Sequence, residues 1–203
     1  MTISANRFLT LEEMTENAEY IMGYLLGKNW TKQSVSGLLG NLQTESTINP
    51  GIWQGLNSYE STPYITVAGA GYGLVQWTPF NKYTVWARDN GMDYKAMDSQ
   101  LARIEFEVAN NLQWFGGYSG EMTFQEFTQS TETPEFLAEV FIKTYEHPAD
   151  PDQPARGTQA RYWYENLTGE PTDPTEPPPP NDGNEIYHML LAGTFPGWNV
   201  RLS

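Results

Sequence analysis

The chain has 203 residues, a formal net charge of −14, no cysteine and two histidines. Without cysteine it can have no thiol nucleophile, disulfide or thiolate metal site, and two histidines do not favour a histidine-rich metal site or a Ser-His-Asp triad. The acidic balance argues against nucleic acid and anionic membranes as partners, and no apolar run is long enough to span a membrane. We therefore expect no metal, no cofactor, no nucleic acid and no membrane span. A neutral glycan remains compatible with this composition.

Two helices are predicted in the first fifty residues. Thr10-Leu-Glu-Glu13 fits a capping box for a helix over 11–28. Its buried face should carry the apolar residues at helical spacing, namely Met14, Ala18, Ile21, Met22 and Leu25. Thr31 caps a second helix with apolar residues at Val35, Leu38, Leu39 and Leu42. Glu45 falls at the end of this helix, before the turn-forming Asn49-Pro50-Gly51.

The middle of the chain alternates loops and helices. Residues 51–72 predict a loop or small hairpin, and 71–77 a short strand whose glycines allow close approach by a partner. A third helix starts at Pro79 or Phe80 and ends near Asn90-Gly91. Asp98 is the expected cap of a long helix over 99–115. The apolar residues of that helix should mostly face inward, namely Leu101, Ile104, Phe106, Val108 and Leu112.

Three further helices follow. Thr123-Phe-Gln-Glu126 fits a second capping box, and Thr133-Pro134 starts a helix that ends near 145–148. The core residues of the latter should be Phe136, Leu137, Val140 and Phe141. A final helix spans about 155–167 and is ended by Gly169. Seven helices and one small strand region predict a mainly helical domain over 1–169.

The composition changes at residue 170. Residues 170–185 are rich in proline and acidic residues and predict an extended linker. Residues 186–203 form a short apolar tail with too few apolar side chains to fold alone.

Glu45 is the first candidate for chemistry. A carboxylate at the last turn of a helix faces the negative end of the helix dipole, and apolar neighbours would also favour its protonated form. A glycosidase needs such an acid to protonate the leaving oxygen, and burial can raise a glutamate pKa to roughly 6. The alternative is an ordinary solvated residue at a helix end.

The motifs around Glu45 resemble those of known families. Glu45-Ser46 followed by Gly73-Leu-Val-Gln76 resembles the signature of goose-type lysozymes and lytic transglycosylases. The strings N-L-Q-T-E-S-T-I-N-P-G-I-W-Q over 41–54 and G-Y-G-L-V-Q-W-T-P over 71–79 are more similar to the phage tail lysozyme family, and the likeness continues to Gly169. This resemblance implies a lysozyme-like α+β domain. Its expected activity is cleavage of the β-1,4 bond between N-acetylmuramic acid and N-acetylglucosamine in peptidoglycan.

The resemblance also implies roles for individual residues. Glu45 would be the general acid and Ser46 would help to position it. Gly73 and Gln76 would line the cleft and bind an acetamido sugar, unless they only shape a hairpin. Three aromatic residues could stack on sugar rings or belong to the core, namely Trp53, Tyr72 and Trp77.

A second carboxylate is harder to assign. Tyr145 resembles the tyrosine of the Ala-Tyr-Asn motif in lytic transglycosylases, but Glu146 replaces the asparagine. Glu146 is either a second cleft carboxylate or an ion-pair partner of Arg156 or Arg161. Glu60, the only acid between Glu45 and Trp77, is the other candidate, or a surface residue.

If no second acid faces Glu45, the acetamido group of the substrate could assist, or Glu45 could act alone and give a 1,6-anhydro product. The resemblance favours hydrolysis by a virion protein of the phage tail, used for delivery of the genome through the host wall. The segment 186–203 would then bind other tail proteins. The alternatives are a lytic transglycosylase, an endolysin that acts from the host cytoplasm before lysis, and a non-catalytic glycan-binding or structural tail module.

Overall fold

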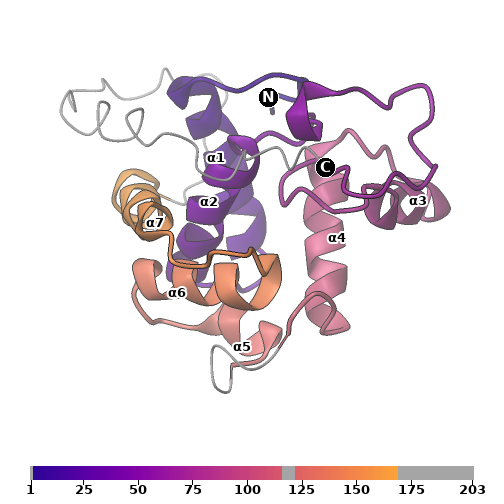
Figure 1. Ribbon diagram of the computed structural model, residues 1–203. Helices are drawn as coiled ribbons and strands as arrows, with labels where there is room; N and C mark the ends of the chain where they lie inside the picture. The colour runs from indigo at the N-terminus through magenta and orange to yellow at the C-terminus, as the bar shows by residue number, and fades with distance from the viewer. Residues whose placement is uncertain (1, 116–121, 169–203) are drawn as a thin grey trace.

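A computed structural model describes residues 2–115 and 122–168 of the protein. The predicted linker over 170–185 and tail over 186–203 lie outside these residues. The described chain is mainly helical (Figure 1). Its elements are α1 (Leu11–Leu26), α2 (Lys32–Ser46), the 3-10 turn η1 (Gln54–Leu56), α3 (Asn81–Asp89), α4 (Met97–Ala109), α5 (Phe124–Gln129), α6 (Pro134–Phe141), the π-helical turn η2 (Ile142–Glu146) and α7 (Pro154–Asn166).

Both predicted capping boxes are confirmed. The Thr10 side chain accepts a hydrogen bond from the backbone of Glu13, and the Glu13 carboxylate accepts one from the backbone of Thr10. Thr123 and Glu126 make the same reciprocal bonds at the start of α5. The predicted inner face of α1 is buried throughout, as expected from its spacing.

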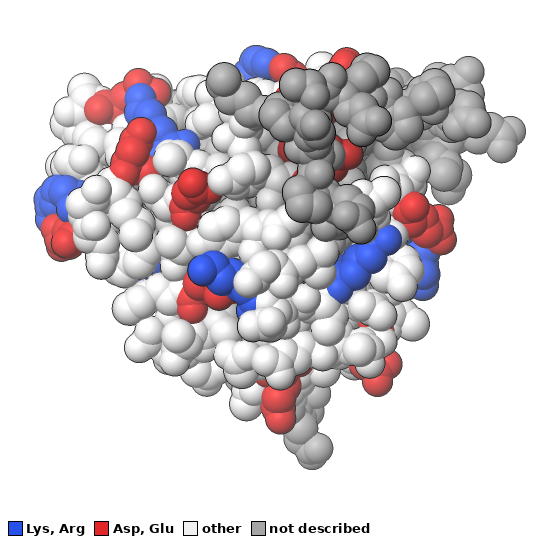
Figure 2. Space-filling view, turned by 180° about the vertical axis from the view of Figure 1, so that it is seen from behind, with Lys and Arg blue, Asp and Glu red and all other residues white. Residues whose placement is uncertain are grey.

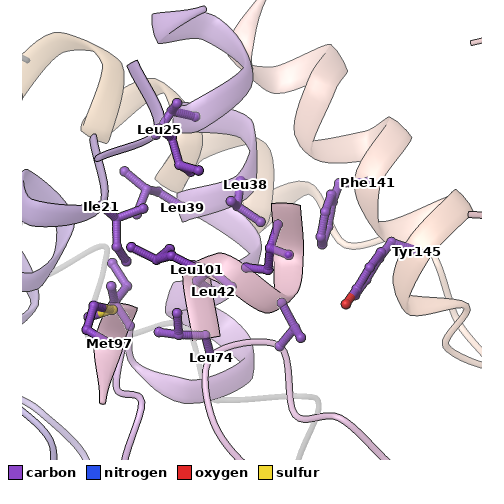
Figure 3. Packing of buried hydrophobic residues seen from close by; sticks show 14 of the residues in the cluster. Ile21, Leu25, Leu38, Leu39, Leu42, Leu74, Met97, Leu101, Phe141 and Tyr145 are labelled. Atoms are coloured by element: carbon purple, nitrogen blue, oxygen red, sulfur yellow. The ribbon is translucent and has the colours of Figure 1, made fainter. Parts of the chain in front are cut away.

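Helix α2 lies at the centre of the domain and packs against α1, α5, α6 and α7. Figure 3 shows its leucines gathered with Ile21 and Leu25 of α1 and Leu101 of α4. Because α2 is surrounded by other helices, nearly all of its side chains are buried. The helix ends at Thr47, which adopts a left-handed conformation with φ of 53°. Glu45 is therefore held in the last turn of the most enclosed helix in the described chain.

The strand predicted over 71–77 is wrong. The segment is a compact loop, and the described residues contain only isolated β-bridges, between Trp53 and Tyr72 and between Tyr72 and Trp77. Positive φ angles of 79° at Gly73 and 50° at Gln76 turn the backbone back on itself. Such angles are incompatible with an extended strand.

The prediction for α4 was wrong at both ends. Ala96 is the N-cap, and Asp98 lies in the first turn, where its carboxylate accepts a hydrogen bond from the Tyr20 hydroxyl. The helix ends at Ala109, because Asn111 and Gln113 adopt positive φ angles of 49° and 57°. Three residues predicted to be core are instead exposed, namely Phe106, Leu112 and Phe136.

Helix α6 does not stop where its regular hydrogen bonds end. It continues as the π-helical turn η2, and His147 then closes the turn in a left-handed conformation with φ of 48°. A π-helical turn accommodates an extra residue and is common at functional sites. Here it carries Tyr145 and Glu146.

The surface charges lie in small mixed groups. In Figure 2 basic side chains lie beside acidic ones, and no continuous basic area appears on the visible part of that face. The described ion pairs include Arg7–Glu13, Arg88–Asp89, Lys95–Glu60 and Lys143–Glu139. No helix within 2–115 or 122–168 is both long and apolar enough to cross a membrane.

Candidate active site

A cleft of about 870 Å³ opens between the end of α2, the loops over 54–78, the turn η2 and the start of α7. Within the described chain, two carboxyl groups line this cleft, those of Glu45 and Glu146. The guanidinium of Arg156 lines it as well. Much of the remaining lining consists of amide and aromatic side chains, namely Gln54, Asn57, Tyr59, Gln76, Trp77, Gln113, Tyr145 and Gln153.

Glu45 forms an ion pair with Arg156. The Nη2 atom of Arg156 donates to Oε1 of Glu45 at 2.5 Å. Arg156 is itself fixed, because Nη1 donates to Oδ1 of Asn41 at 3.0 Å and Nε donates to Oε1 of Gln153 at 2.8 Å. The side chain of Arg156 is 3% exposed and that of Glu45 is 22% exposed. Glu45 therefore has a buried guanidinium from α7 as its charged partner, which the sequence analysis did not predict, while Trp77 and Tyr145 line the same cleft.

Glu146 lies in the same cleft without an ion-pair partner among the described residues. Arg156 binds Glu45, and Arg161 binds Glu135 on α6 at 2.6 Å, so the predicted alternative of an Arg161–Glu146 or Arg156–Glu146 pair is wrong. The Oε1 atom of Glu146 is buried and accepts no hydrogen bond from the described chain. Burial, followed by the negative charge of Glu45, raises the pKa of Glu146 well above its ordinary value. Its environment thus favours the protonated acid.

Tyr145 binds a buried glutamate that the sequence analysis missed. Its hydroxyl donates to Oε2 of Glu107 at 2.5 Å. Oε1 of Glu107 accepts from Nε1 of Trp77 at 3.0 Å and from Nε of Arg103 at 2.8 Å. Glu107 lies on the apolar face of α4, three residues after Ile104. A carboxylate at a core position of an amphipathic helix was the available signal for it.

The loop over 71–78 forms the facing wall. Gly73 is required by its backbone conformation, because its φ of 79° is one that side chains disfavour, and a Cβ atom there would also lie 2.5 Å from Oε1 of the buried Gln100. Gly73 does not line the cleft. Gln76 does, and its Nε2 donates to the backbone oxygen of Gly73 at 2.9 Å. The Oε1 atom of Gln76 is buried and has no hydrogen-bond donor within the described residues.

Several predicted site residues lie away from the cleft. Ser46 is buried and its hydroxyl donates to the backbone oxygen of Leu42 at 3.0 Å. Tyr72 is buried against Trp53, with ring centroids 4.3 Å apart, and both belong to the core.

Glu60 is exposed on its loop and pairs with Lys95 at 3.0 Å. The structure does not bring Glu60 to Glu45 as a second cleft carboxylate.

Trp77 and Tyr145 do line the cleft, as predicted, although each is almost fully buried. Their polar atoms point to Glu107 rather than to solvent. Sequence reasoning did not single out Tyr59 or the amide residues at 54, 57, 113 and 153. Their signal was weak, because amides and aromatics in a loop occur for many reasons. No group of three or more potential metal ligands was found among the described residues.

A mainly helical domain that delivers a glutamate from its central helix into a polar cleft defines a lysozyme-like protein. Comparison with known sequences agrees with this class. Residues 16–167 match the phage tail lysozyme family, so the chain belongs to that family.

One relative is morphogenesis protein 1 of Bacillus phage B103, which is 53% identical over 169 residues. The alignment covers 83% of this chain and 44% of that protein. The chain therefore spans less than half the length of this relative. The family match begins within α1 and ends one residue after α7.

Proposed function

We propose that this protein hydrolyses the glycan strands of peptidoglycan at the β-1,4 bond between N-acetylmuramic acid and N-acetylglucosamine. Membership of the phage tail lysozyme family supports a peptidoglycan substrate. The observation that carries the proposal is the pair of carboxyl groups of Glu45 and Glu146, which line the same cleft. Among the described residues, one guanidinium lines that cleft with them, that of Arg156 on α7, and it is paired with Glu45 on α2. Most glycosidases use two catalytic carboxyl groups that lie in different environments.

The pair suits a site that holds one transferable proton. Arg156 balances one negative charge, and the burial of Glu146 disfavours a second. This one proton is shared within the pair: it resides mainly on Glu146, reaches Glu45, which the motif assigns as general acid, and passes from there to the glycosidic oxygen as the C–O bond breaks. Once the proton has left, two carboxylates lie near the sugar ring. Their negative charge stabilises the positive charge that develops on that ring. Water then adds to the sugar carbon and returns a proton to the pair.

The rest of the cleft suits a neutral, hydroxyl-rich ligand. Amide side chains both donate and accept hydrogen bonds, which matches the hydroxyl and acetamido groups of amino sugars. Gln76 lines the cleft and its Oε1 atom has no hydrogen-bond donor among the described residues, so a rotation of this side chain would let its amide bind an acetamido group or a hydroxyl. Tyr59 and Trp77 supply aromatic surface in the lining. We infer that Gln76 binds the sugar directly and that Tyr72, Gly73 and Ser46 support the site from behind.

Family membership and the phage relative also support a place on the virion, where the enzyme would open the wall for the genome. Residues 186–203, outside the described chain, are the proposed contact with other tail proteins. Detection of the protein in purified particles tests this setting. Its absence from particles, with late expression in infected cells, would favour an endolysin instead.

The bond specificity is tested by mass analysis of wall digests. We expect products with reducing N-acetylmuramic acid ends, because hydrolysis of this bond adds the hydroxyl group of water to C1 of the N-acetylmuramic acid. Products with 1,6-anhydro ends would show a lytic transglycosylase. Intact glycan strands, with binding retained, would show a non-catalytic module and overturn the proposed activity.

The environment of Glu146 predicts a pH-dependent effect on stability. Its pKa is higher in the folded than in the unfolded state, so the native state binds more protons above about pH 4.3, and stability falls as pH rises towards the folded pKa. Glu146→Gln removes this loss. The free energy of unfolding of the variant minus that of the wild type should therefore rise with pH, by up to ~1.4 kcal/mol per pH unit. Urea unfolding from pH 4 to 7.5 measures the slope.

Glu13→Gln is a control of opposite sign. A hydrogen bond from Arg7 is the largest cause that lowers the pKa of Glu13 to about 2, so its contribution is present above the unfolded pKa and is lost as pH falls towards 2. The cost of Glu13→Gln should thus be largest near neutral pH. A flat or falling difference for Glu146→Gln would contradict the assigned environment of Glu146.

A further inference from the structure

Glu107 is the most enclosed carboxylate of the described chain that the proposed reaction does not use directly. Its side chain is 0% exposed. It lies on α4, behind the cleft wall, and does not line the cleft. Placing a carboxylate at such a position is costly unless it is fully hydrogen-bonded. Because burying this carboxylate is costly, we expect Glu107 to have a role other than packing.

Three donors from separate segments converge on this carboxylate. Trp77 comes from the loop over 71–78, Arg103 from the preceding turn of α4, and Tyr145 from η2. The loop carries Gln76 into the cleft, and η2 carries Glu146. Glu107 thus joins the two cleft walls that hold the proposed sugar-binding and acidic groups. No other described carboxylate is bonded to side chains of both walls.

The bonds also fix the direction of the Tyr145 hydroxyl. All three partners are donors, so they match a carboxylate, which only accepts. The Tyr145 proton is committed to Oε2 of Glu107, and the phenolic oxygen keeps its lone pairs for a donor on another side. Since the hydroxyl of Tyr145 points into the protein and Glu146 is the next residue of η2, that donor can be the protonated carboxyl of Glu146.

We propose that Glu107 is a positioning residue of the glycosidase site: through Trp77 and Tyr145 it holds the two walls of the cleft in register and orients the Tyr145 hydroxyl, so that Glu146 faces Glu45. This inference rests on the proposed function. Charged and titratable groups from every neighbouring element act on Glu146, namely Glu45 of α2, Glu107 of α4, Tyr145 of η2 and Arg156 of α7.

Glu107→Gln is the informative change because it preserves shape. The amide oxygen can still accept from Trp77 and Arg103, but the new NH₂ group must then face Tyr145. The Tyr145 hydroxyl has to become an acceptor and turn its proton elsewhere. We expect kcat to fall about 10-fold or more with a small change in KM, since slight misplacement of reacting groups can cost up to ~10²-fold.

A second readout separates positioning from simple structural support. The negative charge of Glu107 contributes to raising the pKa of Glu146, after burial and Glu45. Removing that charge lowers the Glu146 pKa, so the alkaline limb of the kcat profile should shift to lower pH. A purely structural role would lower stability but leave kcat near its wild-type value at pH values below this limb.

The experiment measures kcat, KM and thermal stability of the full chain between pH 4.5 and 8 on soluble glycan-strand fragments. Glu105→Gln is the matched control, because Glu105 lies on the same helix, is partly buried and accepts from Nε1 of Trp30 at 2.7 Å, away from the cleft. It should lose stability but keep kcat and the pH profile. Tyr145→Phe should reproduce the loss of kcat, and combining it with Glu107→Gln should add little.

Unchanged kcat and an unshifted alkaline limb in Glu107→Gln would overturn the inference, as would an equal loss in Glu105→Gln. If Glu107→Gln fails to fold, Tyr145→Phe decides, because it removes one donor and leaves the bonds of Trp77 and Arg103. Wild-type activity in Tyr145→Phe would then refute the proposal. Failure of the wild-type protein to cut glycan strands would instead refute the proposed function, so the two failures are distinguishable.

Discussion

Replacing Glu45 with glutamine is expected to lower the rate of wall digestion by about 10²–10⁴-fold, the usual contribution of a general acid. Glutamine keeps the oxygen that accepts from Arg156 at 2.5 Å, so the link between α2 and α7 should persist. It cannot release a proton to the glycosidic oxygen. Initial rates of turbidity loss with purified cell walls measure the effect, and circular dichroism shows whether the variant is folded.

Two other glutamates serve as controls for Glu45→Gln. Glu135 accepts from Arg161 of α7 at 2.6 Å, so Glu135→Gln weakens a similar pair between helices without touching the cleft. Glu60→Gln removes the carboxylate that pairs with Lys95. Both variants should keep nearly full activity. Full activity in a folded Glu45→Gln protein would refute the role of Glu45 as the acid. A loss of activity in Glu60→Gln would show that Glu60 does contribute to the active site.

Local signals in the sequence were enough to locate most helices. The capping residues Thr10, Thr31, Thr123 and Thr133 all start helices as predicted, because an N-cap depends only on residues within one turn. The end of α4 could not be predicted in the same way. Asn111 and Gln113 adopt left-handed conformations, and asparagine or glutamine can also continue a helix.

The site was predictable only in part, for a related reason. Glu45 and Gln76 were found because each lies in a short motif. Arg156 reaches Glu45 from 111 positions further along the chain, and Tyr145 meets Glu107 across 38 positions. Periodicity and motif spacing describe neighbours along the chain. Pairing across the fold depends on how the helices pack, which those patterns do not specify.

That packing is tested most directly at Gly40, where α2 and α7 touch. A Cβ atom there would lie 2.4 Å from the backbone oxygen of Arg156 and 2.8 Å from the backbone nitrogen of Ala160. Neither atom can move without displacing α7. Gly40→Ala should therefore destabilise the protein by about 1–3 kcal/mol, despite the better helix propensity of alanine, because overpacking costs more than propensity gains.

The same change should lower activity, since Gly40 lies near Glu45 on α2 and opposite the residue that holds it. Gly23→Ala in α1 is the matched control. Apart from adjacent residues and the backbone of its own helix, nothing lies within 4 Å of the position that the alanine methyl would take, so alanine should raise stability by about 0.5–1 kcal/mol and leave activity unchanged. Thermal melts and digestion rates of both variants compare the two positions. If Gly40→Ala were as stable as Gly23→Ala, α7 would be able to move away from α2 at this contact. The position of Arg156 relative to α2 would then not be fixed by packing.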